Sequence, residues 1–220
     1  MIHVIILLLL SISSSTITQQ KSFTIILDPA GDAKRTGRSI GDSFERGLTL
    51  QCAEKIKTLL LTRQPNLTII ISRLPGDNVY ELQNASLANR IQADLFISLN
   101  FYLTQETKPT IYLYQFACDN DFASYQTGLA FNTYDQAYKI NKSTTDTIIN
   151  CFKTHLTQPK YESLFSVAGP YALPIKPLIG IISPSISIEI GLKNKDSWQQ
   201  FVEPVVEAIN YCFVAIKDNL

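Results

Sequence analysis

Two kinds of hydrophobic pattern alternate along the chain. Short runs of Ile, Leu, Phe and Tyr, apolar on both faces or nearly so, are typical of strands in a parallel sheet that is covered on both sides. These predicted strands are residues 23–28, 67–72, 94–99, 110–116 and 185–190. Longer stretches carry apolar residues three and four positions apart, which predicts helices. The predicted helices are residues 43–63, 79–92 and 143–155, and a last helix that begins near residue 196.

Strands that alternate with helices through short links form βαβ units. We therefore expect a single three-layer α/β domain, with a mostly parallel, twisted sheet and helices on both faces. Asp42 or Ser43 is placed to cap the first helix, and Pro204 is expected to kink or split the last one. In such sheets functional groups gather at the carboxyl ends of the strands.

The first residues follow a different pattern. An unbroken apolar run over residues 4–10 precedes a Ser/Thr-rich stretch over residues 13–18. The run is far shorter than the roughly 20 residues of a membrane-spanning helix and fits the apolar region of a signal peptide. We predict a signal peptide over residues 1–20 and a domain over residues 21–220, and therefore export to the periplasm or the extracellular space. An uncleaved anchor and a buried first strand are the alternatives. No later segment is long and apolar enough to span a bilayer.

Composition and charge exclude several classes of protein. The chain has 220 residues, of which 45% are hydrophobic, so it is not mainly disordered. The 19 basic and 19 acidic residues cancel, so nothing favours nucleic acid as a partner. The four cysteines allow three disulfide pairings in an exported chain. Cys52 and Cys212 lie on apolar faces of predicted helices, where buried thiols are expected.

Polar residues that can carry chemistry follow the predicted strands. Residues 28–32 (DPAGD) come after the first strand, Asn100 follows the third, and Glu189 lies at the end of the last. Glu45 lies near the start of the first helix. Because the carboxyl ends of parallel strands meet at one edge of a sheet, these side chains are expected to converge on one crevice.

Four segments at these points resemble, in the same order, the zinc-dependent N-acetylmuramoyl-L-alanine amidases. The segments are IILDP at 25–29, SR at 72–73, LANRIQADLFISLN at 87–100 and PSISIEIGLKN at 184–194. The resemblance covers roughly residues 23–216. It implies cleavage of the amide between the lactyl group of muramic acid and L-alanine, with peptidoglycan or a muropeptide as the partner.

The resemblance also implies a zinc site, from which this chain departs. In the family, a loop histidine, a glutamate at the helix start and a histidine at a strand end hold the zinc, and a glutamate after the last strand acts on the bound water. Glu45 matches the helix glutamate, and Glu189 matches the catalytic one. The histidine positions correspond to Gly31 and Asn100; a slip of one residue would place Asp32 at the first of them.

The count of imidazole groups supports the loss of this site. Of the two histidines, His3 falls within the predicted signal peptide and His155 remains. Zinc sites are built largely from nitrogen and sulfur ligands, whereas the oxygen donors left here suit calcium or magnesium better. We therefore expect no zinc cofactor. We also expect Gly31→His together with Asn100→His to raise zinc affinity, and either change alone to do much less.

Each of these residues also has an interpretation without catalysis. Glu45 lies three residues after Asp42 and fits the capping box of a helix. Glu189 can form a salt bridge with a basic side chain, and Asn100 can bond backbone groups at the strand end. His155 is expected on the surface, near the carboxyl end of the third helix.

A crowd of aromatic residues has two interpretations. The rings can carry sugars, or Tyr112 and Tyr114 line one face of a strand while the others pack a long insertion, which we favour. The aromatic residues are Tyr112, Tyr114, Phe116, Phe122, Tyr125, Phe131, Tyr134 and Tyr138.

Sequence motifs of other hydrolases are missing. There is no G-x-S-x-G and no nucleotide-binding glycine loop. Cys151 lies one helical turn before His155, but no third group completes a catalytic triad.

These observations lead to three hypotheses of function. The first is an exported, amidase-like protein that is catalytically degenerate and acts by cell-wall binding or regulation. The alternative is an active amidase that uses Glu45, Glu189 and Asp32 around another ion. The third is a structural or partner-binding module whose cleft has collapsed around Asn100 and Glu45.

Overall fold

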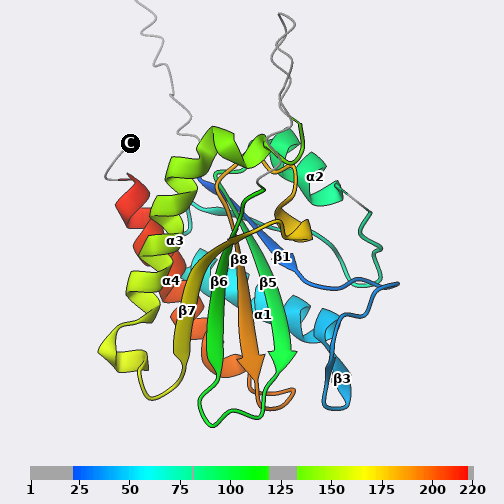
Figure 1. The fold of residues 1–220 in the computed structure, drawn as a ribbon, viewed down its shortest axis with the longest axis vertical. Coiled ribbons are helices and arrows are strands. Elements are labelled where there is room, and N and C mark those ends of the chain that lie inside the picture. Colours follow the sequence, from blue (N-terminus) through cyan, green and yellow to red (C-terminus); the bar gives the residue numbers. More distant parts are fainter. Residues whose placement is uncertain (1–21, 81, 119–132, 218–220) are drawn as a thin grey trace, which may run out of the picture.

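A six-stranded sheet forms the middle of the molecule (Figure 1). The computed structural model describes residues 22–80, 82–118 and 133–217, so the predicted signal peptide lies outside the described residues. The strand order is β4-β1-β5-β8-β6-β7, and β2 (Ser39–Ile40) and β3 (Ser43–Phe44) form a separate small hairpin. The strands of the large sheet are β1 (Thr24–Pro29), β4 (Thr68–Ile71), β5 (Leu95–Leu103), β6 (Thr110–Phe116), β7 (Ser166–Leu173) and β8 (Ser185–Leu192).

The sheet is mostly parallel, as predicted. β4, β1, β5 and β8 run in one direction, while β6 pairs with β8 in the antiparallel sense and β7 pairs with β6 in parallel. β7 was not predicted. Its sequence contains Gly169 and Pro170, which argue against a strand inside a sheet, but β7 is an edge strand, where proline is tolerated.

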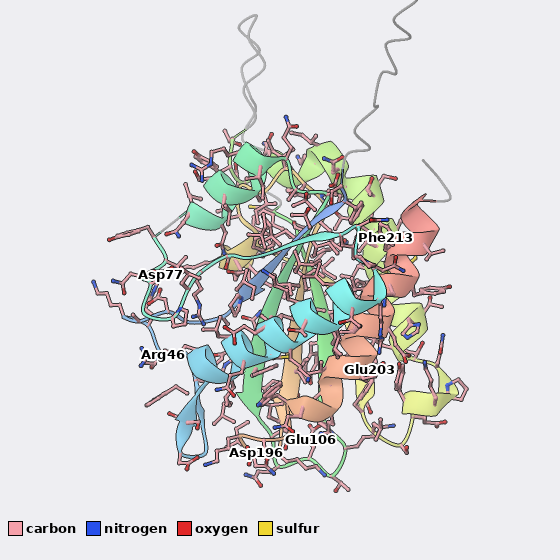
Figure 2. All side chains as sticks on the ribbon, turned by 180° about the vertical axis from the view of Figure 1, so that it is seen from behind. Arg46, Asp77, Glu106, Asp196, Glu203 and Phe213 are labelled. Atoms are coloured by element: carbon pink, nitrogen blue, oxygen red, sulfur yellow. The ribbon has the colours of Figure 1, made fainter. Side chains whose placement is uncertain are left out.

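Helices cover both faces of the sheet, as expected for three layers. Figure 2 shows α1 and α4 lying across the back of the sheet, and α3 packs against α4 on the same side. α2 lies on the other side, where it contacts the short helix η3. The helices are α1 (Glu45–Arg63), α2 (Gln83–Ile91), α3 (Lys142–Leu156) and α4 (Gln199–Lys217), with 3-10 turns η1 (Ala137–Asn141), η2 (Pro159–Tyr161) and η3 (Lys176–Leu178).

Two helix predictions need correction. α2 begins at Gln83, four residues later than predicted, and α4 is one helix that continues through Pro204. Proline removes one backbone hydrogen bond. The neighbouring Val205, Val206 and Ile209 are fully buried, and this burial stabilises the helix across the proline. Of the kink or split expected at Pro204, the split is therefore wrong.

The two faces of the sheet are covered unequally. The larger cluster of buried side chains lies between the sheet and α1, α3 and α4, and it includes Cys52 and Cys212, as predicted. A smaller cluster lies beneath α2 and η3. In Figure 1, no described helix lies in front of the lower parts of β5, β8 and β6. We call this uncovered part of the sheet the open face.

No helix among the described residues is both long enough and apolar enough to cross a membrane.

Candidate functional site

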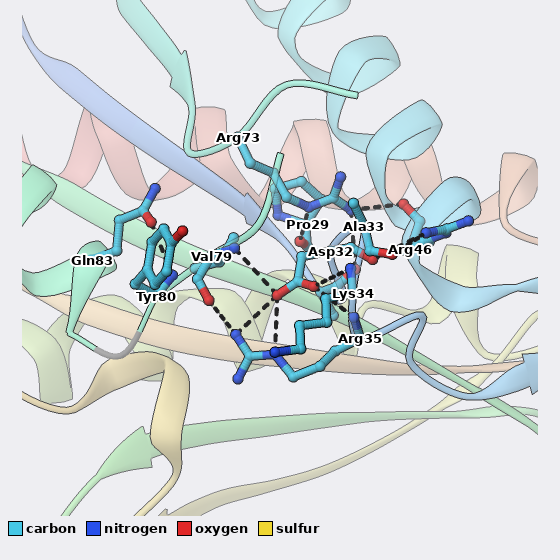
Figure 3. Close-up of polar contacts among 11 residues, drawn as sticks. Pro29, Asp32, Ala33, Lys34, Arg35, Arg46, Arg73, Val79, Tyr80 and Gln83 are labelled. Carbon is cyan, nitrogen blue, oxygen red and sulfur yellow. Dashed lines mark hydrogen bonds and ion pairs between the residues drawn. The ribbon is translucent and has the colours of Figure 1, made fainter. Parts of the chain in front are cut away.

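The loop between β1 and α1 borders the open face and is held by buried charges. Arg73, which follows β4, is buried and donates three hydrogen bonds to backbone carbonyls: to Pro29 at 3.0 Å, to Ala30 at 3.2 Å and to Arg46 at 2.7 Å (Figure 3). A guanidinium with several fixed donors can join segments in this way. Arg73 therefore fixes the loop to the first turn of α1.

Asp32 organises the same loop and has no free oxygen for a metal ion. Its carboxylate accepts hydrogen bonds from the backbone N–H groups of Lys34, Arg35 and Val79 and from the Arg35 guanidinium (Figure 3). Burial alone would raise the pKa of Asp32, but these hydrogen bonds outweigh it and lower the pKa to about 2. Asp32 is therefore an ionised loop anchor.

Gly31 occupies a position that a larger residue does not fit. Its φ is +77°, in the left-handed region that favours glycine. A Cβ atom built there would lie 2.8 Å from the Cβ of Arg46 and 3.1 Å from the carbonyl oxygen of Arg35. An imidazole at this position would require the loop to move.

Glu45 is the first residue of α1, and its buried carboxylate binds backbone groups. One oxygen accepts the Arg38 N–H at 3.0 Å and the other accepts the Phe101 N–H of β5 at 2.8 Å. The predicted capping box is wrong, because the N-cap residue is Phe44 and no side chain caps the helix. Asp42 instead pairs with Lys195 at 2.8 Å. Glu45 thus ties α1 and the loop to β5.

Asn100 and Glu189 lie side by side, one in β5 and one in β8. Both were expected just at strand ends, but each strand continues beyond them. The Asn100 amide donates to the Ser187 hydroxyl at 2.9 Å and to the Ser98 hydroxyl at 3.3 Å. Asn100 therefore bonds neighbouring side chains, and not the backbone groups that we considered.

Glu189 is engaged at both of its carboxylate oxygens. One forms a salt bridge with Arg38 at 2.6 Å, and the other accepts the Tyr114 hydroxyl at 3.1 Å. The same guanidinium donates to the carbonyl oxygen of Phe101 at 3.0 Å. The salt-bridge alternative for Glu189 is thus present in the structure. Sequence reasoning missed Arg38, since nothing distinguishes it from other basic residues of the loop.

These contacts bring part of the predicted site together. Glu45, Asn100 and Glu189 are joined through Arg38 and the backbone of Phe101. Asp32 belongs instead to the hydrogen-bond network of the loop. Three of the expected positions therefore lie together, with a guanidinium among them that was not anticipated.

The chain is similar to known proteins in both sequence and structure. A stretch of 76 residues is 33% identical to the N-acetylmuramoyl-L-alanine amidase CwlM of Bacillus licheniformis, covering 34% of this chain and 30% of that protein. The structure matches the CwlD amidase of Clostridioides difficile, solved with the GerS lipoprotein, with a TM-score of 0.61 and 15% identity over 90% of this chain and 99% of CwlD. The chain has the fold of the N-acetylmuramoyl-L-alanine amidases.

A second solved structure agrees with the first. The catalytic domain of the amidase CwlV from Bacillus (Paenibacillus) polymyxa var. colistinus gives a TM-score of 0.57 and 14% identity, over 89% of this chain and 98% of that domain. No family model matches the chain. The resemblance to the amidase family is thus confirmed in sequence and in fold, while the curated relative is matched over less than a third of its length.

The donor set at the amidase-like site does not fit zinc. In residues 22–80, 82–118 and 133–217, no group of three or more His, Cys, Asp or Glu side chains is arranged to hold a metal ion. Both oxygens of Glu45 accept backbone N–H groups, and Asn100 directs its amide N–H groups at serine hydroxyls. A cationic guanidinium contacts Glu189. A catalytic zinc ion needs three protein ligands with free lone pairs.

His155 is buried, so its predicted surface position is wrong. Its ring lies against Tyr161 and Tyr211, and its Nε2 atom is 3.4 Å from a Glu207 carboxylate oxygen. Burial lowers the pKa of His155. The helix pattern did not reveal this because residues after α3 and residues of α4 cover the ring. α3 and α4 lie behind the sheet, so His155 is not part of the site at Glu189.

Proposed function

We propose that this chain is an exported, amidase-like protein that binds peptidoglycan or a muropeptide without hydrolysing it, and that it acts by binding or regulation. The observation that carries the proposal is the salt bridge between Arg38 and Glu189. It sets a cation against the residue that corresponds to the family's catalytic glutamate.

Hydrolysis of an unstrained amide near neutral pH needs an activated water molecule. The family activates water with zinc and a glutamate that is free to take a proton. Here Gly31 offers no side-chain ligand atom, and Asn100 has an amide, whose Nδ2 donates to two hydroxyls, in place of an imidazole. With Glu189 held by Arg38 and Tyr114, these positions supply neither zinc ligands nor a free base.

The alternative of an active amidase with another ion requires Asp32 to join Glu45 and Glu189. The Asp32 carboxylate is taken up by Lys34, Arg35 and Val79. Its recruitment would cost those hydrogen bonds and release the loop. This argues for the degenerate form.

The test measures binding and hydrolysis in the same tube. The purified full chain is incubated with purified insoluble peptidoglycan, with and without added zinc, beside an active zinc amidase and a Glu189→Gln variant. We expect the protein to sediment with the peptidoglycan and to release no muropeptides under either condition. Release that EDTA and Glu189→Gln both abolish would establish the active-amidase alternative. Failure of the wild type to sediment would overturn the binding part.

Rebuilding the site offers a stricter test. Gly31→His with Asn100→His remains expected to raise zinc affinity, and the structure adds that Gly31→His must displace the loop near Arg46. A triple variant that also carries Arg38→Ala removes the competing cation and is expected to bind zinc more tightly than the double variant. Equal zinc affinity of the two, measured by calorimetry, would show that Arg38 does not compete with the metal.

A further inference from the structure

Four tyrosines from the open face and from the adjoining strand β7 form one continuous surface, which we call the tyrosine surface: Tyr102, Tyr112, Tyr114 and Tyr171. Their ring centroids are 5.8 Å apart between Tyr114 and Tyr171, 6.0 Å between Tyr102 and Tyr112, 6.3 Å between Tyr112 and Tyr114 and 6.5 Å between Tyr112 and Tyr171. Three strands, β5, β6 and β7, therefore bring their rings into one array. Only Tyr112 and Tyr114 were singled out from the sequence.

The tyrosine surface is not part of the hydrophobic core. None of its four residues belongs to either cluster of buried side chains in the described residues. Tyr171 is 45% exposed, and the other three are partly exposed. A role in packing would bury the rings. Instead the rings belong to strands β5, β6 and β7, and exposed contiguous aromatic surface marks binding sites.

The ring of Tyr102 lies over the neighbouring strand β8. Tyr102 pairs in register with Gly191 of β8. A Cβ atom at Gly191 would lie 2.8 Å from the Tyr102 hydroxyl oxygen and 2.9 Å from the ring carbon that bears it. Glycine at this position leaves the room that the ring occupies.

Polar groups lie among the rings and join them to the candidate site. The Tyr114 hydroxyl donates to Glu189, and the Tyr102 hydroxyl donates to the carbonyl oxygen of Thr110 at 3.3 Å. Burial and nearby negative charge raise the pKa of Tyr102 to about 12, so its phenol stays neutral at physiological pH. The surface therefore combines aromatic faces with neutral hydroxyls and the carboxylate of Glu189.

This combination selects among ligand classes. Single-stranded nucleic acid also stacks on aromatic rings but needs a groove of positive charge. Here the Arg38 cation is paired with Glu189, and Glu106 adds negative charge near Tyr102. A sugar ring presents C–H groups to the electron-rich face of an aromatic ring and hydroxyls to its polar edge. It needs no positive charge.

We infer that the tyrosine surface binds the sugar rings of a glycan strand beside Glu189, so that the protein recognises the glycan part of its ligand and not the peptide part. The inference rests on the proposed function and specifies it. The tyrosine surface is continuous with the candidate site through the hydrogen bond from Tyr114 to Glu189.

The experiment compares two ligands and matched variants of the full chain. The ligands are insoluble peptidoglycan, assayed by sedimentation, and chitohexaose, a soluble glycan without peptide, assayed by calorimetry. The variants are Tyr171→Ala, Tyr112→Ala with Tyr171→Ala, and Tyr171→Phe. The control is Tyr211→Ala. The exposed fraction of Tyr211, 43%, is similar to that of Tyr171, but Tyr211 lies on α4 behind the sheet. Thermal unfolding of each variant shows whether it folds.

We expect the wild type to bind both ligands. Tyr171→Ala should weaken chitohexaose binding about three- to tenfold, the usual range for one aromatic contact, and the double variant by more. Tyr171→Phe keeps the ring and should bind within about twofold of the wild type, as should Tyr211→Ala.

The outcomes separate the two claims. If peptidoglycan is bound but chitohexaose is not, or if folded tyrosine variants bind both as the wild type does, the inference is overturned and the proposed function stands. If chitohexaose is bound through the tyrosines but peptidoglycan is not, the proposed function fails and the sugar-binding surface stands. If neither ligand is bound, both the inference and the binding part of the proposed function fail. If the variants change only self-association in sedimentation velocity, the inference fails and the surface belongs to a contact between copies of the chain.

Discussion

β5 and β8 present two unlike sets of side chains, one to each side of the sheet. Towards α1, α3 and α4 they present Leu99, Phe101, Ile188 and Ile190, all fully buried. Alternate positions on the open face carry polar groups such as Asn100, which bonds two serine hydroxyls, and Glu189, which bonds Tyr114 and the loop residue Arg38. Because side chains alternate along a strand, one set can keep the fold while the other changes.

Under the proposed loss of the zinc ligands, this difference explains how an amidase fold could persist. The buried face holds the core that fixes the strand register. Histidine or asparagine at position 100 faces the other way and does not contribute to that core. A change there alters chemistry at a small cost in stability. The four predictions below test this separation.

The largest effect is expected from Ile188→Ala. The side chain is fully buried between the sheet and the helices, so its truncation should lower the free energy of unfolding by about 2–5 kcal/mol. Urea denaturation measures the change. A loss below about 1 kcal/mol would mean that the buried face tolerates cavities, and the contrast between the faces would disappear.

A smaller loss of unfolding free energy is expected when the Arg73 guanidinium, which holds the loop between β1 and α1, is removed. Arg73→Met removes the charged donor from three backbone carbonyl groups, one buried and two partly buried, and should cost about 3 kcal/mol. Arg90→Met on the exposed side of α2 is the control and should stay within about 0.5 kcal/mol of the wild type. If both variants unfold at the same urea concentration, Arg73 does not hold the loop.

Protonation of Asp32 at low pH should lower the free energy of unfolding. The pKa is about 2 in the folded chain, below the ordinary value of 3.8, so the carboxylate stabilises the fold above pH 3.8 and loses this effect as the pH falls towards 2. Water screens the exposed Arg35 partner, so the contribution is about 1 kcal/mol. The difference in unfolding free energy between wild type and Asp32→Asn should shrink between about pH 4 and pH 2; a constant difference would contradict this role.

The smallest effect is expected at Glu189. Its Arg38 partner is 53% exposed, and such pairs contribute little to stability. Glu189→Gln should therefore change the free energy of unfolding by about 1 kcal/mol or less, in the same urea experiment as Ile188→Ala. A loss as large as that of Ile188→Ala would show that the open face also carries the fold.

The sequence predicted most of the sheet because its buried strands are continuous apolar runs. β7 escaped because its residues are partly exposed and include Gly169 and Pro170, so neither run nor alternation is visible. The start of α2 was placed too early, since residues 79–82 continue the pattern of a helix but form none that the structure describes.

The candidate site was predictable only in part. The positions of Glu45, Asn100 and Glu189 followed from strand ends and from the family resemblance. Arg38 did not, because its contact with Glu189 depends on the path of a loop that left-handed glycines shape, among them Gly31 and Gly37. Which cation reaches a carboxylate across such a loop is a property of three-dimensional packing.

The outer edge of β7 has a consequence for the behaviour of the protein in concentrated solution. No described strand pairs with this edge, and such edges invite further strands and aggregation. Pro170 lies in the middle of β7 and has no N–H group to offer an incoming chain. The proline that hid this strand from sequence analysis thus makes the edge of β7 a poorer template for an added strand.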